Sequence, residues 1–291
     1  MGQDDKRPIV LLGYPLEHSL SPLIHNTAFE HQGLDFHYSL HPVHPVKLEE
    51  ELLRLAHKGL VGANVTVPHK EAVVRLLDET SDVVQAIGAA NTISCRQEDS
   101  GVRLVGENSD VGGFIAPIWK ILPELDDRQV LIFGSGGAAR AVGFALTKYA
   151  RPRRIVIAAR TAETGGQLVN VLLAQRPGFA VDYVGLTEAS DEVRSSTLLV
   201  NATPIGMGAG SEESIWSRDG DFHEGQIAYD LVYWPLETRF LRTARLRGAR
   251  TLGGLEMLIA QAALSYAIWT GRKMPVETVR QELQQHLGMS T

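Results

Sequence analysis

A glycine-rich turn between a strand-like segment and a helix-like segment is the feature that most constrains the fold. The apolar run VLIFG ends at Gly134, GSGGAA occupies 134–139, and RIVIAAR forms a second apolar run over 154–160. A buried strand, a glycine turn that opens a helix and a second strand make one βαβ unit. Such a unit requires a parallel sheet covered by helices, so the sequence predicts an α/β fold.

The first 108 residues show the same alternation of strand and helix. Strands are predicted at 9–13, 35–40 and 62–67, helices at 24–31, 47–58 and 71–78, and extended segments at 89–95 and 102–105. The stretch LEMLIAQAALSYAIWTG near the C-terminus is apolar on nearly every face, which predicts a buried helix.

We therefore expect two open α/β domains with a cleft between them. Residues 1–108, together with C-terminal helices over about 255–291, should form a substrate-binding and catalytic domain. Residues 109–254 should form a Rossmann-type dinucleotide-binding domain, because the βαβ pattern is clearest there.

Composition excludes several classes of protein. The 291 residues carry a net charge of -6 without a basic run, so neither a nucleic acid nor a membrane surface is an expected partner. The single cysteine, Cys95, allows no intramolecular disulfide, and the polar first residues do not resemble a signal peptide, so we expect a cytoplasmic protein. The histidines of HYSLHPVH lack a nearby carboxylate or cysteine cluster, so no metal site is expected.

The glycine turn has two interpretations. A plain βα turn is one of them. In the other, backbone N–H groups at the positive end of a helix approach a pyrophosphate, with Gly134 allowing the turn, Gly136 allowing close approach and Ala139 replacing a third glycine. The strand, helix and second strand around the turn favour the cofactor interpretation.

The end of the second strand bears on the choice of cofactor. Arg160 and Thr161 stand where an NAD-binding protein usually offers a carboxylate to the ribose hydroxyls. An arginine and a hydroxyl hold a 2′-phosphate instead, so NADP is favoured over NAD. Glu163 is close enough in sequence to bind a ribose, which would favour NAD.

Two polar clusters at predicted strand ends are candidates for chemistry. NVTVPHK contains Lys70 and ENSD contains Asp110. Reduction of a ketone needs a proton donor, and a lysine held by a carboxylate can supply the proton. From spacing alone, a solvated surface charge is the favoured interpretation of each residue, because charges at strand ends are commonly solvated.

Further polar residues have both functional and structural interpretations. Ser19 and Ser21 are placed to face one carboxylate from an extended loop, although serine before Pro22 is also ordinary turn chemistry. Thr66, Asn91 and Gln261 either bond ligand hydroxyls or satisfy buried backbone groups.

Taken together, these motifs resemble the shikimate dehydrogenase family over nearly the whole chain. GYPLEHSLSPLIHN, ANVTVPHK, IGAANTI and GENSDVGGF resemble its substrate loop and its lysine, asparagine and aspartate segments, in the family's order. GSGGAARA and AART resemble its phosphate loop and NADP-selecting stretch, and NATPIGM, YDLVY and GGLEMLIAQAA resemble later segments. The resemblance implies NADP-dependent, reversible reduction of 3-dehydroshikimate to shikimate, a step of chorismate and aromatic amino acid biosynthesis.

The resemblance also implies roles for individual residues. The implied catalytic pair is Lys70 and Asp110. The implied substrate residues are Ser19, Ser21, Thr66, Lys70, Asn91, Asp110, Tyr233 and Gln261. The implied cofactor residues are Gly134, Ser135, Gly136, Gly137, Ala138, Arg160, Thr161, Thr203, Leu231 and Gly254, with Asp82 as a weaker correspondence.

The chain departs from the family pattern at a few positions. The family often has aspartate at Glu107, asparagine at Ala159, a second arginine at Thr164 and glycine at Glu256. The changes at Ala159 and Thr164 weaken the case for NADP. The alternatives are a broader quinate/shikimate dehydrogenase that uses NAD, and a non-catalytic sensor of metabolite and nucleotide; the expected assembly is a monomer or a homodimer.

Overall fold

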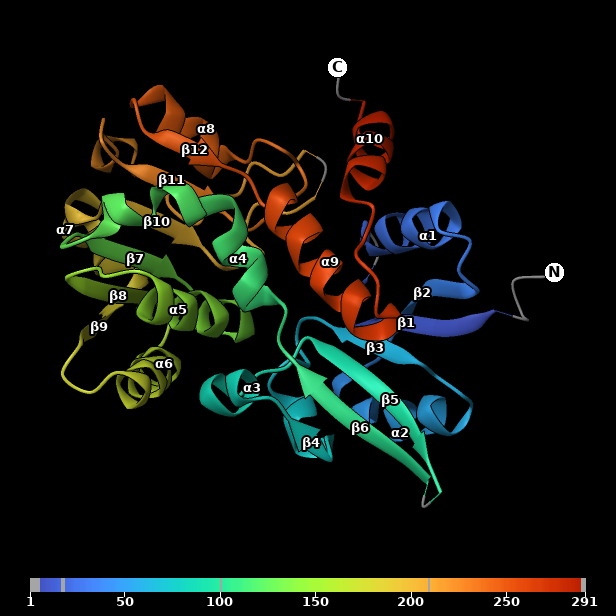
Figure 1. The fold of residues 1–291 in the computed structure, drawn as a ribbon. Coiled ribbons are helices and arrows are strands. Elements are labelled where there is room, and N and C mark those ends of the chain that lie inside the picture. The colour runs from blue at the N-terminus through green and yellow to red at the C-terminus, as the bar shows by residue number, and fades with distance from the viewer. Residues whose placement is uncertain (1–5, 17–18, 100, 209, 289–291) are drawn as a thin grey trace. The chain divides into compact units, whose positions relative to one another are not determined.

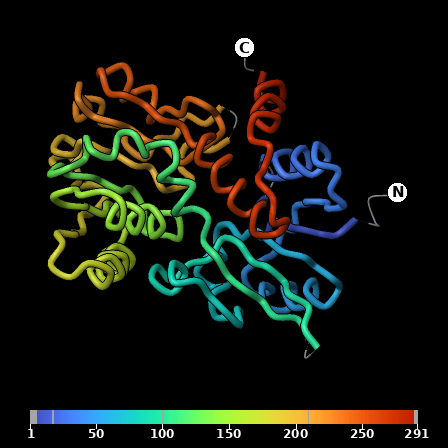
Figure 2. Tube along the Cα trace, in the orientation of Figure 1, coloured from blue at the N-terminus to red at the C-terminus, as the bar shows by residue number. Residues whose placement is uncertain are grey.

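The computed structural model describes residues 6–16, 19–99, 101–208 and 210–288. The chain divides into two compact units, the first made of 1–109 and 259–291 and the second of 110–258. Figures 1 and 2 trace the chain through both units, and its last segment rejoins the first unit. Each unit contains one six-stranded sheet with helices packed against it, which confirms the predicted α/β fold.

The sheet of the first unit has the strand order β2-β1-β3-β5-β6-β4. β1 lies parallel to both β2 and β3, whereas β5 is antiparallel to β3 and to β6. The carboxyl ends of β1, β2 and β3 therefore lie at the same edge as the start of β5 and the end of β6. The strands are β1 (Arg7–Gly13), β2 (Phe36–Pro42), β3 (Gly62–Val65), β4 (Glu79–Thr80), β5 (Thr92–Glu98) and β6 (Gly101–Glu107).

Helices cover both faces of this sheet (Figure 1). They are α1 (Ser21–His31), α2 (Leu48–His57), α3 (Asp82–Ile87), α9 (Leu255–Thr270) and α10 (Val276–His286). In α2, glutamates fill the first turn and basic residues the last, which suits the helix dipole, and the apolar face of Leu48, Leu52 and Ala56 is buried.

The two faces of the first sheet have different cores. One face packs aliphatic side chains such as Val10 and Ile93 against α2 and α3. The other packs aromatic rings: His25 of α1 stacks on Tyr38 with 4.5 Å between ring centroids, and Trp269 of α9 lies 5.3 Å from His25. Gly62 makes room for Trp269, whose Nε1 donates to the carbonyl oxygen of Ile93 at 2.9 Å.

The sheet of the second unit is wholly parallel, with the order β12-β11-β10-β7-β8-β9. In reverse, this is the 3-2-1-4-5-6 order of a Rossmann sheet, whose direction of winding changes between β7 and β10. The strands are β7 (Gln129–Phe133), β8 (Arg154–Ala159), β9 (Ala180–Gly185), β10 (Leu198–Asn201), β11 (Ile227–Asp230) and β12 (Arg250–Leu252). Ligands bind such sheets at the carboxyl edge beside this change of direction.

Helices also cover the second sheet on both faces. They are α4 (Asp110–Ile118), α5 (Gly137–Tyr149), α6 (Ala162–Gln175), α7 (Ser190–Ser195) and α8 (Arg239–Leu246). One face packs Leu131, Phe133 and Val156 against α7 and α8. On the other, α4 contributes Phe114, which stacks on Tyr229 of β11, and Gly143 of α5 lies against Leu172 of α6.

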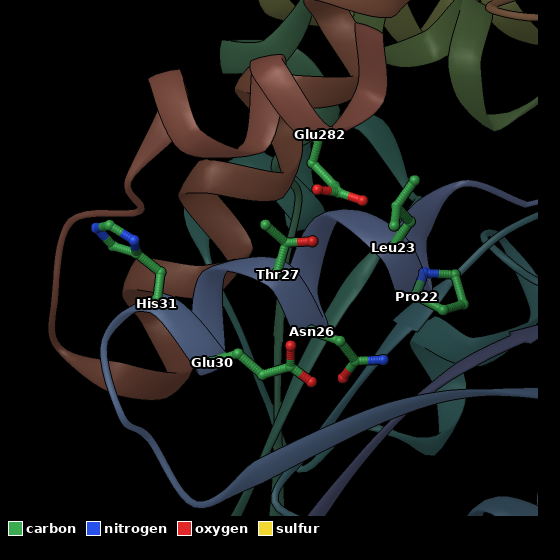
Figure 3. A pocket seen from close by; sticks show the side chains of 7 residues that line it. All are labelled: Pro22, Leu23, Asn26, Thr27, Glu30, His31 and Glu282. Atoms are coloured by element: carbon green, nitrogen blue, oxygen red, sulfur yellow. The ribbon is translucent and has the colours of Figure 1, made fainter. Parts of the chain in front are cut away.

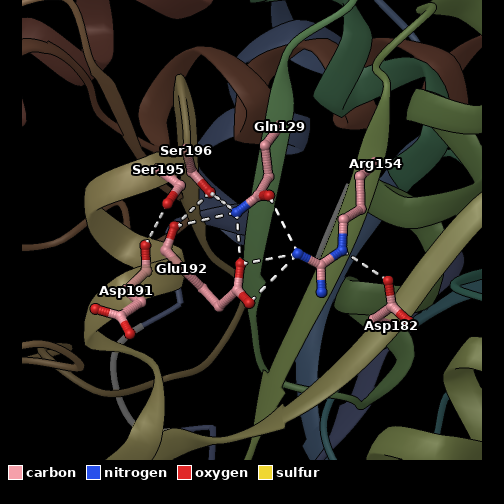
Figure 4. A network of polar contacts seen from close by, with 7 residues as sticks. All are labelled: Gln129, Arg154, Asp182, Asp191, Glu192, Ser195 and Ser196. Atoms are coloured by element: carbon pink, nitrogen blue, oxygen red, sulfur yellow. Dashed lines mark hydrogen bonds and ion pairs between the residues drawn. The ribbon is translucent and has the colours of Figure 1, made fainter.

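A polar network joins the amino ends of β7 and β8 to α7 (Figure 4). The buried Gln129 donates to Glu192 Oε2 at 2.7 Å, and Arg154 forms ion pairs with Glu192 at 3.2 Å and Asp182 at 2.6 Å. Because this network lies at the amino edge of the sheet, it is far from the carboxyl edge where a Rossmann sheet binds ligands, and we assign it a structural role.

Several local predictions differ from the structure. Residues 71–78 were predicted as an α-helix but form a 3-10 turn over Ala72–Leu76. The helix α9 is not buried on all faces, because Leu264 and Ile268 are 43% and 41% exposed. Within the described part of the chain, no helix combines the length and apolarity needed to cross a membrane.

Candidate active site

The loops that follow β1 and β3 lie together at the carboxyl edge of the first sheet. The Thr66 N–H donates to the Leu12 carbonyl at 2.8 Å, and the Tyr14 N–H donates to the Val67 carbonyl at 3.0 Å. A side chain at Gly13 would approach Thr66 Cγ2 to 2.4 Å, so glycine allows the two loops to pack closely. The structure thus brings the serine loop and the lysine segment together.

Within these loops, the side chains of the predicted substrate residues are buried to different degrees. Ser21 begins α1 and is buried, and its N–H donates to Ser19 Oγ at 3.2 Å, which ties the two serines to each other. Thr66 and Lys70 are half-buried. The Lys70 carbonyl accepts from the Ala90 N–H at 2.8 Å, so the lysine segment lies beside the residue that precedes Asn91.

Asn91 stands between the lysine segment and the end of β6. Its N–H donates to the Glu107 carbonyl at 3.1 Å, and its Oδ1 accepts from the Ser109 N–H at 2.7 Å. Ser109 Oγ also lies 3.3 Å from Oε1 of Gln261 on α9. Six of the eight predicted substrate residues thus belong to the first unit, at or beside the carboxyl edge of its sheet, namely Ser19, Ser21, Thr66, Lys70, Asn91 and Gln261.

A buried hydrogen-bond network behind Asn91 was not predicted. Asn64 of β3 donates from Nδ2 to the Asn91 carbonyl at 3.0 Å and to Ser265 Oγ at 3.0 Å, and its Oδ1 accepts from the Tyr38 hydroxyl at 2.9 Å. The only indication of this network in the sequence is that Asn64 belongs to the NVTVPHK motif, because its partner Ser265 lies 201 residues away.

The remaining two predicted substrate residues belong to the second unit. Asp110 is the first residue of α4 and is buried, and Tyr233 follows β11 in a half-buried loop. Lys70 belongs to the first unit, so the pairing of Lys70 with Asp110 stays a prediction.

The glycine turn of the second unit has the geometry that a dinucleotide requires. Gly134 follows β7 with φ at 107°, and a side chain there would approach Thr203 Cγ2 to 2.9 Å. Gly134 and Thr203 follow β7 and β10, the two strands where the sheet changes its direction of winding. Gly136 is the N-cap residue of α5, and a side chain at this position would meet no atom within 4 Å. The backbone at the N-terminus of α5 is therefore open to close approach, as the binding of a pyrophosphate requires.

A cluster of hydroxyl groups lies at the ends of β7 and β8. Ser135 Oγ donates to Thr164 Oγ1 at 2.9 Å, and Thr164 Oγ1 lies 2.9 Å from Thr161 Oγ1, which caps α6. Arg160 is exposed and forms no hydrogen bond or ion pair with any residue that the structure describes. A guanidinium beside donor hydroxyls fits a phosphate group.

The other predicted cofactor residues are divided between the units. A side chain at Gly254 would approach the Leu231 carbonyl oxygen to 2.3 Å, so these two residues lie in contact at the carboxyl edge of the second sheet. Gly137 and Ala138 form the first turn of α5. Asp82 instead lies in the first unit, exposed in the first turn of α3, so the structure does not group it with the others.

A buried carboxylate supports the strand ends near Thr203 and Leu231. Asp230 accepts from Asn201 Nδ2 at 2.9 Å and from the Thr238 hydroxyl at 2.6 Å, while Asn201 Oδ1 accepts from the Thr203 hydroxyl at 2.7 Å. Burial raises the pKa of Asp230 to about 6, although the hydrogen bonds it accepts oppose this shift. The network holds the loop that carries Thr203.

A separate pocket of about 590 Å³ lies between α1 and α10 (Figure 3). Glu282 of α10 faces it together with side chains of α1. None of the predicted site residues lines this pocket, whose walls are Pro22, Leu23, Asn26, Thr27, Glu30, His31 and Glu282.

Comparison with known proteins identifies the family. Residues 11–93 match the model of the shikimate dehydrogenase substrate binding domain, and residues 254–284 match that of the shikimate 5'-dehydrogenase C-terminal domain. The shikimate dehydrogenase (NADP(+)) of Salinibacter ruber is 44% identical over 278 residues, which cover 95% of this chain and 96% of the relative. The chain belongs to the shikimate dehydrogenase family.

Solved structures of this fold agree with the assignment to the shikimate dehydrogenase family. Shikimate 5-dehydrogenase of Thermus thermophilus, in complex with NADP(H) and shikimate, is 33% identical with a TM-score of 0.80, covering 96% of this chain and 98% of that one. Quinate dehydrogenase of Corynebacterium glutamicum, in complex with NAD, is 28% identical with a TM-score of 0.84, covering 97% and 99%. The family predicted from the motifs is confirmed.

Proposed function

We propose that this protein catalyses the reversible, NADP-dependent reduction of 3-dehydroshikimate to shikimate. The observation that carries the proposal is the gathering of Ser19, Thr66, Lys70, Asn91 and Gln261 around one sheet edge of the first unit. Shikimate has one carboxylate and three hydroxyls, which these hydroxyl, amide and ammonium groups suit. The relatives named above act on the same compound class.

NADP would bind at the carboxyl edge of the second sheet. The α5 N-terminus with Gly134, Ser135, Gly136, Gly137 and Ala138 would hold the pyrophosphate. Arg160 and Thr161 would hold the 2′-phosphate, and Thr203, Leu231 and Gly254 would lie at the nicotinamide end. When bound, the reduced cofactor supplies a hydride to the ketone carbon.

The proton of the reaction would come from Lys70. As the ketone carbon gains hydride, negative charge develops on its oxygen, and the Lys70 ammonium donates a proton there to give the hydroxyl. Asp110 would hold the ammonium in position. In this proposal Lys70 and Asp110 also contact the substrate, together with Ser21 and Tyr233.

Two observations favour a second candidate function. Ala159 and Thr164 stand where the family often has residues that contact NADP, and the similar Corynebacterium glutamicum enzyme is a quinate dehydrogenase in complex with NAD. A broader quinate/shikimate dehydrogenase would also place Glu163, exposed in the first turn of α6, near the ribose.

One assay separates these candidates. Nucleotide absorbance is followed with the purified protein for shikimate and quinate, each with NADP and with NAD. With shikimate, we expect turnover with NADP to exceed turnover with NAD by about tenfold or more, since a charge-assisted contact to the 2′-phosphate contributes about 1.5–3 kcal/mol. We also expect shikimate to be turned over faster than quinate. Comparable turnover with quinate or NAD would favour the broader enzyme, and no turnover in any combination would support a sensor.

We also propose that the protein acts in the cytoplasm as a monomer or homodimer. The single cysteine and the biosynthetic role of the family support the compartment. Light scattering coupled to size-exclusion chromatography tests the assembly, and a mass above that of a dimer would contradict it.

A further inference from the structure

The residue directly before Lys70 is a histidine that the proposed chemistry does not use. His69 is only 1% exposed, and its ring atom Nε2 lies 2.7 Å from the carbonyl oxygen of Val43. A carbonyl oxygen can only accept, so Nε2 carries a hydrogen and donates it. Burial lowers the pKa of His69, and the hydrogen bond to Val43 opposes this shift only in part, so the ring is neutral at about pH 7.

The acceptor of this hydrogen bond belongs to the loop that follows β2. The Val43 N–H donates to the Gly13 carbonyl at 2.9 Å, which ties this loop to the end of β1. Val43 is 2% exposed, and among the residues that the structure describes only His69 donates to its carbonyl. Because a buried carbonyl without a donor costs about 1–3 kcal/mol, this contact fixes the His69 ring against the loop after β2.

The backbone is held on both sides of Lys70. The His69 N–H donates to the Thr66 carbonyl at 2.9 Å, which closes a turn, and the Val73 N–H donates to the His69 carbonyl at 2.9 Å. The Ala90 N–H donates to the Lys70 carbonyl at 2.8 Å. Since His69 and Lys70 share a peptide unit, an anchored His69 ring also limits the movement of the point from which the Lys70 side chain leaves the backbone.

We propose that His69 is a positioning residue that holds Lys70 in place for proton transfer. It does so by tying the turn before Lys70 to the loop after β2. A reacting group must be held within about 0.5 Å of its productive position, and a displacement of about 1 Å can lower a rate about a hundredfold. His69 takes no part in the proton transfer, because its own proton is donated to Val43. This inference rests on the proposed function, in which Lys70 is the proton donor.

Two substitutions at His69 separate the hydrogen bond from the shape of the ring. Phenylalanine keeps a ring but has no N–H, so His69→Phe should lower kcat for shikimate and NADP about tenfold. The KM for NADP should stay unchanged, because the proposed nucleotide site lies in the second unit. Glutamine carries an N–H close to the position of the histidine Nε2, so His69→Gln should keep kcat within about threefold of the unmodified protein. Unmodified kcat in His69→Phe, or an equal loss in both variants, would overturn the proposal.

A double-mutant cycle tests whether His69 acts through Lys70. In the Lys70→Ala background, His69→Phe should lower the residual kcat by less than about twofold, because the side chain that it positions is gone. A loss as large as in the unmodified background would show that His69 affects turnover by another route, which contradicts the proposal.

His57 provides a matched control. Its Nδ1 also lies 2.7 Å from a backbone carbonyl oxygen, that of Leu53, but His57 is exposed at the end of α2. His57→Phe should therefore leave kcat unchanged. If it lowered kcat as much as His69→Phe does, the loss would not be specific to the lysine segment and the proposal would fail.

Two further measurements do not depend on the folding of His69→Phe. If that variant does not fold, His69→Asn takes its place, since the shorter amide does not reach the Val43 carbonyl and should give the same loss of kcat. Nitrogen-15 NMR of the unmodified protein reports which ring atom of His69 carries the hydrogen at about pH 7. A hydrogen on Nε2 alone is expected, whereas a hydrogen on Nδ1 would rule out the proposed state of the ring.

The two levels of inference fail in different ways. If the unmodified protein does not turn over shikimate with NADP, the proposed function fails. If the unmodified protein is active and the double-mutant cycle shows no coupling, only the role of His69 fails.

Discussion

Lys70 is the residue on which the proposed chemistry most depends. It is half-buried, and its backbone is anchored to Ala90 beside Asn91, so its side chain starts from a well-supported position. We expect Lys70→Ala to lower kcat by about a hundredfold or more, the usual contribution of a positioned proton donor, with a smaller change in the KM for shikimate. Steady-state kinetics measures both, and Lys58→Ala, at an exposed lysine after α2, is the control. Wild-type kcat in Lys70→Ala would contradict the role.

The hydrogen bonds of Thr164 lead to a prediction about cofactor choice. Its hydroxyl bonds those of Ser135 and Thr161 beside the exposed Arg160. If this cluster holds the 2′-phosphate, Thr164→Val should raise the KM for NADP about fivefold by removing one hydrogen bond, and leave the KM for NAD unchanged, because NAD lacks that phosphate. Parallel titrations with both nucleotides provide the control, and equal changes in the two KM values would rule out this role.

At this scale, local motifs in the sequence predict the residues whose proposed roles depend on neighbours in the chain, but not those whose contacts depend on distant partners. Arg160 and Thr161 follow directly from the end of a predicted strand. Asn64 and Ser109 also stand inside quoted motifs, yet their partners Ser265 and Gln261 lie on α9, more than 150 residues further along the chain. A local sequence pattern cannot predict such a contact.

Among the elements, the second unit was the easier to predict. Its strands are continuous apolar runs separated by helices, and a parallel sheet with covered faces produces that pattern. In the first unit, the alternation of strand and helix predicted an open α/β domain, but it did not predict that β5 lies antiparallel to both β3 and β6. The helix α9 was predicted as wholly buried because its sequence is apolar throughout, whereas Leu264 and Ile268 are exposed. Hydrophobic patterns do not show which apolar face lacks a partner.

Two adjacent glycines in α6 give a prediction at the scale of the element. A side chain at Gly166 would meet nothing within 4 Å, whereas one at Gly165 would lie 2.2 Å from the ring of Tyr183 in β9. Gly166→Ala should therefore stabilise the protein by about 0.5–1 kcal/mol through helix propensity. Gly165→Ala gains the same propensity but forces α6 away from β9, and should destabilise by about 1–3 kcal/mol.

Thermal unfolding of the two variants, each compared with the unmodified protein, checks this pair. We expect Tm to rise by a few degrees in Gly166→Ala and to fall in Gly165→Ala. Because the substitutions are chemically identical and adjacent, a common sign of the Tm change would show that contact with Tyr183 does not control the packing of α6.

At the scale of the whole molecule, each unit contains a buried group with a shifted pKa, and the two shifts have opposite effects on stability. Burial among Tyr38, Phe29 and Trp269 lowers the pKa of His25 to about 3. Below pH 6.5, the ordinary pKa of histidine, the unfolded chain binds a proton on His25. The folded first unit does not bind this proton until the pH approaches 3, so protonation favours the unfolded chain. The stability that His25 contributes is therefore present above pH 6.5 and is lost as pH falls toward 3.

Asp230 has the opposite dependence in the second unit. Its pKa is raised from 3.8 to about 6, so between these values the folded state holds more protons than the unfolded state. Its contribution to stability is present below pH 3.8 and is lost as pH rises through 6. Each group gives a slope of at most about 1.4 kcal/mol per pH unit, and between about pH 4 and 6 the two slopes oppose each other.

Urea unfolding between pH 4.5 and 6.5 separates the two contributions. We expect the free energy of unfolding of His25→Phe to increase less with pH than that of the unmodified protein, because phenylalanine fills the aromatic site without titrating. Asp230→Asn should increase more with pH, because the group that loses stability with rising pH is gone. The signs of these two slope differences are the test, since substitutions that only weaken packing shift the free energy equally at every pH. Parallel pH profiles for either variant would show that its group keeps an ordinary pKa in the folded chain.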